Sequence, residues 1–303
     1  MSGRSLPSWR NGTTRTELVG FLRDADQLPV EERVAVFDND GTLWCEKPLY
    51  TQVDFFVQEL RRAAASDKSL RVRPEYRAVL DNDQPAMAEM GLQRIAFSLV
   101  ELCQGIGPEE FEDRVTRFFA AARHPDRGVP YSQMRYQPML ELIDELRAHS
   151  FSVYLVTGGG TEFVRAVCQS FYGVPQEGVV GSGVVYEVTR NGERPSLVRT
   201  TELLGEANEG GAKISNIQRQ LGRRPILAGG NSPGDTAMLE YAAASDGPSL
   251  ALVVHHDDGD REYAYESVAG TFTADESLPE TARRLGWAIA SMKDDWDVVF
   301  TAD

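Results

Sequence analysis

The sequence lacks a long hydrophobic segment and has no excess of basic residues. Its 303 residues contain no apolar run of roughly the 18 residues that a membrane-spanning helix needs. The N-terminal stretch is polar, without an apolar segment of signal-peptide length, so we expect a cytoplasmic protein. Lys and Arg number 31 against 46 Asp and Glu, a formal net charge of −15. This acidity disfavours binding to nucleic acid or to anionic membranes.

Cysteine is also scarce. The three cysteines, Cys45, Cys103 and Cys168, are odd in number and widely spaced, with no CxxC pair. This pattern argues against a disulfide framework or a cysteine zinc site and fits reduced thiols. Cys45 lies near the motif described below, where we expect it to pack as a small apolar residue.

What the sequence does contain is a series of short apolar runs, each followed by Gly, Asn, Asp, Thr or His. They cover residues 34–37, 153–156, 226–228 and 250–254. Continuous runs of this length are typical of parallel strands buried on both faces. Apolar residues at helical spacing lie between them, which predicts an α/β fold with a doubly wound parallel sheet. Such sheets bind ligands at the carboxyl ends of their strands, and the polar clusters all follow the runs at that end.

Well over a hundred residues separate the first two predicted strands. A strand–helix–strand crossover needs only about 30. We therefore interpret 49–130 as a helical cap, and 1–48 with 131–303 as the α/β catalytic core. The alternative is one domain with an enlarged helical layer. Residues 178–200 alternate in polarity around an Asn-Gly turn and predict a β-hairpin. The C-terminal stretch 287–300 is ambiguous between helix and strand.

The strongest chemical signal is Asp38-Asn39-Asp40-Gly41-Thr42, directly after the first apolar run. Gly41 lets the backbone turn at the strand end, so both carboxylates can reach one site. One carboxylate can attack phosphorus and the other can transfer protons to and from the oxygens. The alternative reading is a turn with solvated acids.

Two further motifs supply groups that bind anions. Thr157 and Gly158 open a glycine-rich turn between a predicted strand and a predicted helix, where a hydroxyl and backbone N–H groups can hold phosphate. Lys213, at the start of a predicted helix, can hold both a carboxylate and a phosphate. Taken singly, either motif could be structural.

Oxygen ligands for a metal ion follow the third run, in Gly-Asn-Ser-Pro-Gly-Asp. Mg²⁺ prefers oxygen ligands and retains several waters. Asp38, the backbone carbonyl of Asp40 and the side-chain oxygen of Asn231 form a suitable partial set. Asp235 could ligate the metal, directly or through water, or fix Lys213.

The loop after Thr42 contains candidates for contact with the substrate, namely Trp44, Glu46 and Lys47. Trp44 has packing as its alternative role. Adjacent histidines on a strand point to opposite faces, so we expect His255 and His256 to have structural roles and not to share a metal ion.

Together, these motifs resemble the haloacid dehalogenase-like superfamily, and the inserted helices resemble its phosphoserine phosphatase-like branch. The resemblance implies Asp38 as nucleophile and Asp40 as acid and base. It implies phosphate binding by Thr157 and Lys213, and Mg²⁺ binding by acids of the fourth motif. Asn231 departs from the family, which most often has Asp there.

The resemblance also implies a reaction. An acid at position 40 is typical of members that cleave phosphate esters, so we expect a Mg²⁺-dependent phosphatase acting on a small phosphorylated metabolite. Two alternatives remain, a phosphotransferase with the same intermediate and a non-catalytic protein that binds a phosphorylated ligand.

Overall fold

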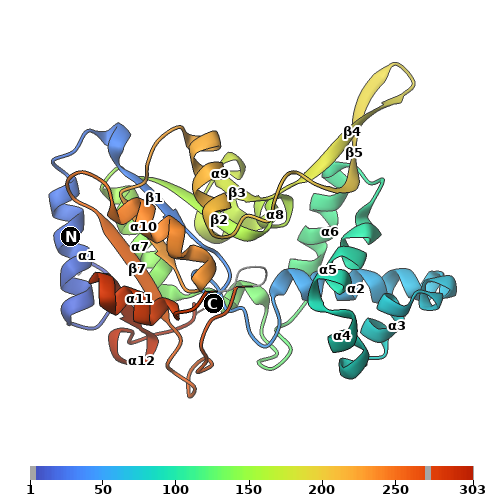
Figure 1. Cartoon of the computed structure of the whole chain (residues 1–303), viewed down its shortest axis with the longest axis horizontal. Coiled ribbons are helices and arrows are strands. Elements are labelled where there is room, and N and C mark those ends of the chain that lie inside the picture. The colour runs from blue at the N-terminus through green and yellow to red at the C-terminus, as the bar shows by residue number, and fades with distance from the viewer. Residues whose placement is uncertain (1–4, 270–273, 303) are drawn as a thin grey trace.

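The computed structural model of the chain describes residues 5–269 and 274–302. In these residues six parallel strands form one sheet, in the order β3-β2-β1-β6-β7-β8 (Figure 1). Their bounds are β1 (Val34–Phe37), β2 (Ser152–Gly160), β3 (Val179–Ser182), β6 (Leu227–Gly230), β7 (Leu250–His255) and β8 (Ala288–Ser291). The predicted parallel sheet is confirmed. Strand β1 lies between β2 and β6, so the strand order reverses at β1. Sheets of this kind bind ligands at the carboxyl ends of the strands where the order reverses.

Helices cover both faces of this sheet. One layer is α1 (Thr13–Ala25), α7 (Gln137–Ala148) and α8 (Thr161–Tyr172), and the other is α9 (Gly211–Leu221), α10 (Thr236–Ala243) and α11 (Leu278–Leu285). In β1, Ala35 and Phe37 pack into the first layer and Val36 into the second. The continuous apolar sequence of the strand follows from this burial on both sides.

A helical insertion separates β1 from β2. It contains α2 (Thr51–Ser66), α3 (Pro74–Leu80), α4 (Gln84–Met90), α5 (Leu92–Val100) and α6 (Pro108–Ala121). These helices lie beyond the carboxyl end of β1, on the right of Figure 1. Phe55 on α2 joins them to the core, because its ring contacts Phe111 on α6 at 5.7 Å and Phe163 on α8 at 5.5 Å between centroids.

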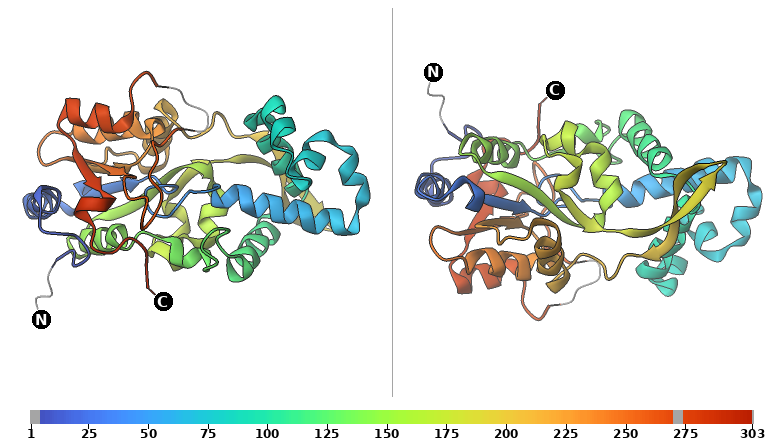
Figure 2. Two further views of the ribbon diagram at one scale, coloured as in Figure 1. Left: turned by 90° about the horizontal axis from the view of Figure 1, so that it is seen from below. Right: turned by 90° about the horizontal axis from the view of Figure 1, so that it is seen from above.

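The predicted hairpin is present but shorter at its start. Its strands are β4 (Val184–Asn191) and β5 (Arg194–Leu203), which pair antiparallel. Residues 179–182 instead form β3, because buried Val179 and Val180 pair in parallel with β2. The hairpin runs alongside the helical insertion in both views of Figure 2. Strand β5 bonds its backbone to that insertion, since the Arg199 N–H donates to the Ile106 carbonyl at 2.9 Å.

The remaining elements are short. The ambiguous C-terminal stretch contains β8, followed by α12 (Met292–Asp295). Turns of 3₁₀ helix lie at Val30–Glu32, Lys68–Val72, Glu101–Cys103, Tyr131–Met134, Gln176–Gly178 and Pro233–Asp235.

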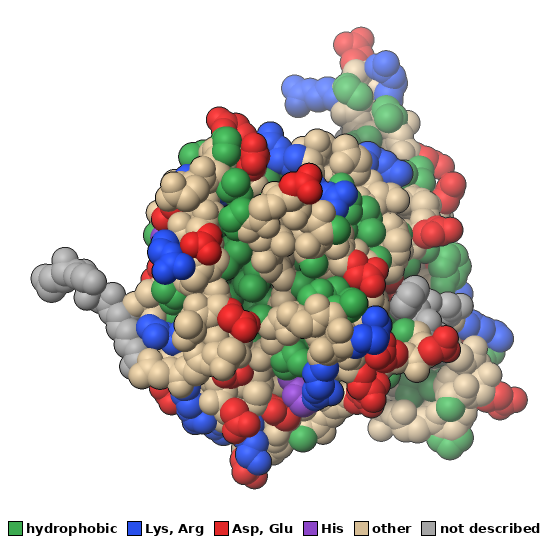
Figure 3. Space-filling model, turned by 60° about the vertical axis from the view of Figure 1, so that its left-hand side comes forward, with side chains coloured by type: hydrophobic (Ala, Val, Ile, Leu, Met, Phe, Trp, Pro, Cys, Tyr) green, Lys and Arg blue, Asp and Glu red, His purple; other side chains and the backbone are tan. Residues whose placement is uncertain are grey.

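The described part of the chain contains no helix with both the length and the apolar character to cross a membrane. On the face in Figure 3, Lys and Arg side chains are interspersed with Asp and Glu. The basic side chains form no continuous patch on this face. All three cysteines are free and buried, and burial raises the pKa of the Cys103 and Cys168 thiols to about 11. Protonated, buried thiols are chemically inert, as a packing role requires.

The contact between the insertion and the core can be tested at Phe55. We expect Phe55→Ala to lower the free energy of unfolding by about 3–5 kcal/mol, because it leaves a cavity among aromatic rings. Phe97→Ala is the matched control, since this ring on α5 is 47% exposed; it should change stability by less than about 0.5 kcal/mol. Urea denaturation measures the free energy of unfolding of both variants. Equal effects would contradict the packing of Phe55 between the insertion and the core.

Candidate active site

Asp38 is the first residue after β1. Its backbone N–H donates to the Gly229 carbonyl at 2.9 Å, which extends the strand pairing by one residue. The chain then turns at Gly41, whose φ of 74° favours glycine. A Cβ on Gly41 would lie 2.0 Å from Nδ2 of Asn231, so the loop tolerates no side chain there. As a result, Asp38 and Asp40 both line one cavity.

Lys213, in the first turn of α9, connects the residue after β1, strand β2 and the turn after β6. Its Nζ donates to Oδ1 of Asp38 at 2.7 Å, to Oδ1 of Asp235 at 2.5 Å and to the Val156 carbonyl at 2.8 Å. Burial lowers the pKa of Lys213, but the carboxylates of Asp235 and Asp38 outweigh burial and raise the pKa above its ordinary value. The lysine is therefore a fixed buried cation.

Asp235 is occupied on both oxygens. Oδ1 accepts from Lys213, and Oδ2 accepts the N–H groups of Asn231 and Ser232 at 3.0 Å each. A Cβ on Gly230 would lie 2.5 Å from Cβ of Asp235, so this glycine permits the tight turn. Asp235 thus holds Lys213 by a direct ion pair, which is one of the roles expected for it.

Asn231 lies against the Asp38 loop from the neighbouring strand β6. Its Oδ1 accepts the Thr42 hydroxyl at 3.1 Å. Its Nδ2 donates to Oγ of Ser267 at 3.0 Å and to Oε1 of Glu46 at 3.4 Å. The amide thus presents its oxygen towards the motif and its nitrogen towards a buried carboxylate.

Thr157 and Gly158 come from the carboxyl end of β2. Oγ1 of Thr157 accepts the Gly159 N–H at 2.9 Å, and as a hydroxyl it still has a proton to donate. The next N–H, of Gly160, donates to Oε1 of Gln52 at 2.8 Å. Sequence reasoning missed Gln52, which belongs to the first turn of the helical insertion and reaches this loop across 108 positions of sequence.

The three residues predicted to contact the substrate lie in different places relative to the cavity. Glu46 lines the cavity. Trp44 is only 2% exposed and lies behind Asp40, with Nε1 donating to Oδ1 of Asp40 at 2.9 Å. Its ring packs 5.8 Å from Phe119 on α6, so the packing alternative describes it better than substrate contact. Lys47 places Nζ 4.4 Å above the Tyr265 ring and is not among the described residues that line the cavity.

The two adjacent histidines diverge, as predicted. His256 is buried, with Nε2 2.8 Å from the Gly41 carbonyl and Nδ1 3.2 Å from Oε2 of Glu262. The His255 ring instead lies 3.5 Å from Oδ2 of Asp257. His256 therefore supports the Asp38 loop from behind, and Glu262 in turn holds the His256 ring.

Negative charge dominates the strand ends. Burial raises the pKa of Asp38, Asp40 and Glu46, and repulsion by Asp235 raises that of Asp38 further against the opposing effect of Lys213. Within residues 5–269 and 274–302, no cluster of three or more His, Cys, Asp or Glu side chains is arranged to hold a metal ion. The oxygens of Asp38 and Asn231 and the carbonyl of Asp40 are the donor type that Mg²⁺ uses, and the surplus of carboxylates fits a divalent cation.

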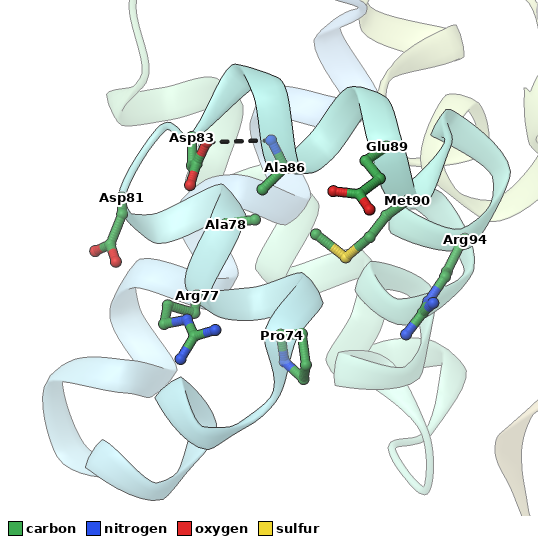
Figure 4. Close-up of a pocket in the computed structure, with 9 residues that line it drawn as sticks. All are labelled: Pro74, Arg77, Ala78, Asp81, Asp83, Ala86, Glu89, Met90 and Arg94. Atoms are coloured by element: carbon green, nitrogen blue, oxygen red, sulfur yellow. Dashed lines mark hydrogen bonds between the residues drawn. The ribbon is translucent and has the colours of Figure 1, made fainter.

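The cavity at these strand ends has a volume of about 330 Å³. Its wall includes residues from α2, α5 and the hairpin. A separate hollow of about 430 Å³ lies among α3, α4 and α5 (Figure 4). There Asp83 accepts the Ala86 N–H and begins α4, and Arg94 pairs with Glu75, so these charges stabilise the helices.

The burial of Asp40 predicts a pH-dependent stability. Because burial raises its pKa in the folded state, its stabilising contribution is full below the ordinary aspartate pKa and is lost as the pH rises through the raised value. In metal-free buffer we expect Asp40→Asn to increase the free energy of unfolding at pH 8 by about 0.5–2 kcal/mol. The gain should vanish near pH 4.

Thermal or urea unfolding across this pH range measures the difference. Asp24→Asn, a change at an exposed carboxylate on α1, is the control and should have little effect at either pH. If Asp40→Asn instead lowers the free energy of unfolding at pH 8, burial of the charged Asp40 carboxylate does not destabilise the fold.

Comparison with known proteins identifies the family of the chain. The family model of haloacid dehalogenase-like hydrolases matches residues 35–240. A structure of a protein of unknown function from Bordetella pertussis Tohama I aligns with a TM-score of 0.54 and 17% identity, over 85% of this chain and 97% of that one. At this identity the likeness shows the fold.

Two other solved structures align less well. One is a probable phosphoserine phosphatase from Vibrio cholerae, with TM-score 0.41 and 14% identity over 87% of this chain and 67% of that one. The other is a phosphoserine phosphohydrolase-like protein from Francisella tularensis subsp. tularensis SCHU S4, with TM-score 0.40 and 14% identity over 84% and 99%. No curated protein matches. Because the family match spans more than half of the sequence, the chain belongs to the haloacid dehalogenase-like hydrolases.

Proposed function

We propose that this hydrolase is a Mg²⁺-dependent phosphatase that acts through an aspartyl-phosphate on Asp38. One observation carries the proposal. Lys213 holds Asp38 at 2.7 Å inside a cavity that Asp40, two residues further on, also lines. A buried nucleophile fixed by a cation, with a second acid beside it, suits phosphoryl transfer in two steps.

In the first step, a carboxylate oxygen of Asp38 attacks phosphorus and the bond to the alcohol oxygen breaks. Oδ1 of Asp38 accepts from Lys213, which leaves Oδ2 to attack. Asp40 gives its proton to the departing oxygen. Burial raises the pKa of Asp40, which favours the protonated form that this step needs.

In the second step, water attacks the phosphorus of the aspartyl-phosphate. Asp40, now ionised, takes a proton from that water, and inorganic phosphate leaves as Asp38 is regenerated. The Trp44 N–H donates to Oδ1 of Asp40 at 2.9 Å and orients the carboxyl group for both transfers. We therefore assign Trp44 as a positioning residue.

Three groups are proposed to bind the phosphate oxygens, namely the Thr157 hydroxyl, the Gly158 N–H and Lys213. They come from β2 and from the first turn of α9. Each is a donor held in place before the substrate arrives, which is how transition-state charge is stabilised without reorganisation. Gln52 positions this turn through its bond to the Gly160 N–H.

Asp38, the Asp40 carbonyl and Asn231 are proposed to hold Mg²⁺. When bound, the ion supplies positive charge next to the phosphate oxygens. Asp235 keeps Lys213 and the Asn231 N–H in place, as its occupied oxygens indicate. We infer that the helical insertion, within 49–130, acts as a cap over a small phosphorylated substrate, as in the phosphoserine phosphatase-like branch.

Replacement of the nucleophile tests the mechanism. Asp38→Asn should reduce hydrolysis of benzyl phosphate by at least about 10³-fold, because an amide cannot form the acyl phosphate. The exposed control Asp24→Asn should retain activity. Parent protein quenched in acid should contain a phosphoryl group on Asp38 by mass spectrometry. Near-normal turnover by Asp38→Asn would refute the assignment.

Metal removal tests the cofactor and the non-catalytic alternative together. We expect chelation with EDTA to abolish hydrolysis and added Mg²⁺ to restore it, because Lys213 alone does not balance the buried carboxylates. Phosphate release is the readout. Activity that persists after exhaustive chelation would exclude the metal, and transfer to added alcohols in place of water would indicate a phosphotransferase.

A further inference from the structure

The cavity beyond the phosphate-binding groups has an apolar wall. The insertion and the hairpin supply the side chains, which are Val53, Phe56, Ala96, Leu99, Val100, Val184 and Leu203. On α5, residues 96, 99 and 100 have the spacing of one helical face, and this face borders the cavity. Phe97, also on α5, is 47% exposed and is not among the residues that line the cavity.

The cations that line this cavity are already paired. Lys213 is held by Asp38 and Asp235 at the strand ends. Arg199, on the hairpin, is 5% exposed. Its Nη1 lies 3.3 Å from Oε2 of Glu162, and its guanidinium lies 4.0 Å from the centre of the Phe111 ring. A carboxylate on the leaving group would therefore enter without a free partner, which is costly in a desolvated site.

An ammonium group on the substrate would also lack an acidic partner in the apolar part of the cavity. Glu46 lies in the loop after Asp40. Its Oε1 accepts from Nδ2 of Asn231 at 3.4 Å and lies 4.0 Å from Nζ of Lys47. Glu209 also lines the cavity, but it lies beside the phosphate-binding turn, where a Cβ on Gly158 would come within 3.0 Å of its Oε1. In the part of the wall beyond this turn, Glu162 pairs with Arg199, and Glu46 lies against Asn231 and Lys47, so the apolar side chains are left to contact the leaving group.

We propose that the leaving group is an uncharged, apolar alcohol about the size of one ring. This inference rests on the proposed phosphatase function and names its substrate class. A volume of about 330 Å³ is near the lower limit for small-molecule sites, and part of it belongs to the phosphate. Burial of the apolar alcohol against α2, α5 and the hairpin would supply the binding energy. Amino-acid phosphates would be poor substrates.

A set of alkyl phosphates with similar ester chemistry tests the proposal. We would compare kcat/KM for benzyl phosphate, methyl phosphate, O-phosphoserine and phosphoethanolamine, with Mg²⁺ present. The proposal expects benzyl phosphate to exceed each of the other three by at least about tenfold. Equal values for benzyl and methyl phosphate, or a preference for phosphoserine or phosphoethanolamine, would overturn it.

A matched pair of variants locates the effect. Val100→Arg places a charge on the cavity face of α5, and Phe97→Arg places the same charge on its exposed side. Val100→Arg should reduce the benzyl-to-methyl ratio by at least about tenfold, whereas Phe97→Arg should leave the ratio unchanged. An unchanged ratio in Val100→Arg, with normal circular dichroism, would count against this wall as the binding surface.

Binding separates this inference from the proposed function. Calorimetry with the Asp38→Asn protein should show benzyl phosphate binding at least about tenfold more tightly than methyl phosphate. If that preference holds but no ester is hydrolysed by the parent protein, the phosphatase function fails and the apolar site stands. If esters are hydrolysed but the binding preference is missing, the function stands and the substrate class is wrong.

Discussion

The ion cluster of Lys213, Asp38 and Asp235 is the constraint on which the rest of the site depends. One buried ammonium joins the carboxyl ends of β1 and β2 to the turn after β6 through three hydrogen bonds. Removing one member of such a cluster leaves an uncompensated charge in a desolvated place. Gly41 and Gly230 keep the neighbouring backbone close, because a Cβ at these positions would collide with Asn231 and with Asp235, respectively.

Around this cluster, the fold divides two tasks between separate parts of the chain. The loops at the carboxyl edge of the parallel sheet and the first turn of α9 supply the charged and hydrogen-bonding groups around Asp38. The insertion and the hairpin supply the apolar wall, and they bond to each other through the backbone of Arg199 and Ile106. Changes in the wall can therefore alter specificity while leaving the phosphate-binding groups in place, as functional sites grafted on a common fold allow.

The sequence predicted the sheet and the grouping of the strand-end motifs because these are local signals. Buried runs followed by polar turns indicate where parallel strands end. The prediction of a hairpin was wrong for residues 178–182, because their alternating polarity resembles a hairpin strand although they form a short buried strand of the main sheet. The sequence left the stretch containing β8 undecided between helix and strand. No local pattern indicates the contact of Gln52 with Gly160, 108 positions away, or that of Glu262 with Tyr136, 126 positions away. The domain boundaries and the roles of the site residues stay predictions.

The position of Trp44 has a consequence for how the cavity can open. The indole holds Asp40 by a hydrogen bond on one edge and packs against Phe119 of α6 on its ring. A displacement of α6 away from the core would remove part of the support for that ring. If the insertion opens to exchange ligands, the Asp40 carboxyl group, which we propose transfers protons, would lose part of its orientation, and closure would restore it. Under the proposed mechanism, proton transfer would then be tied to the closed arrangement.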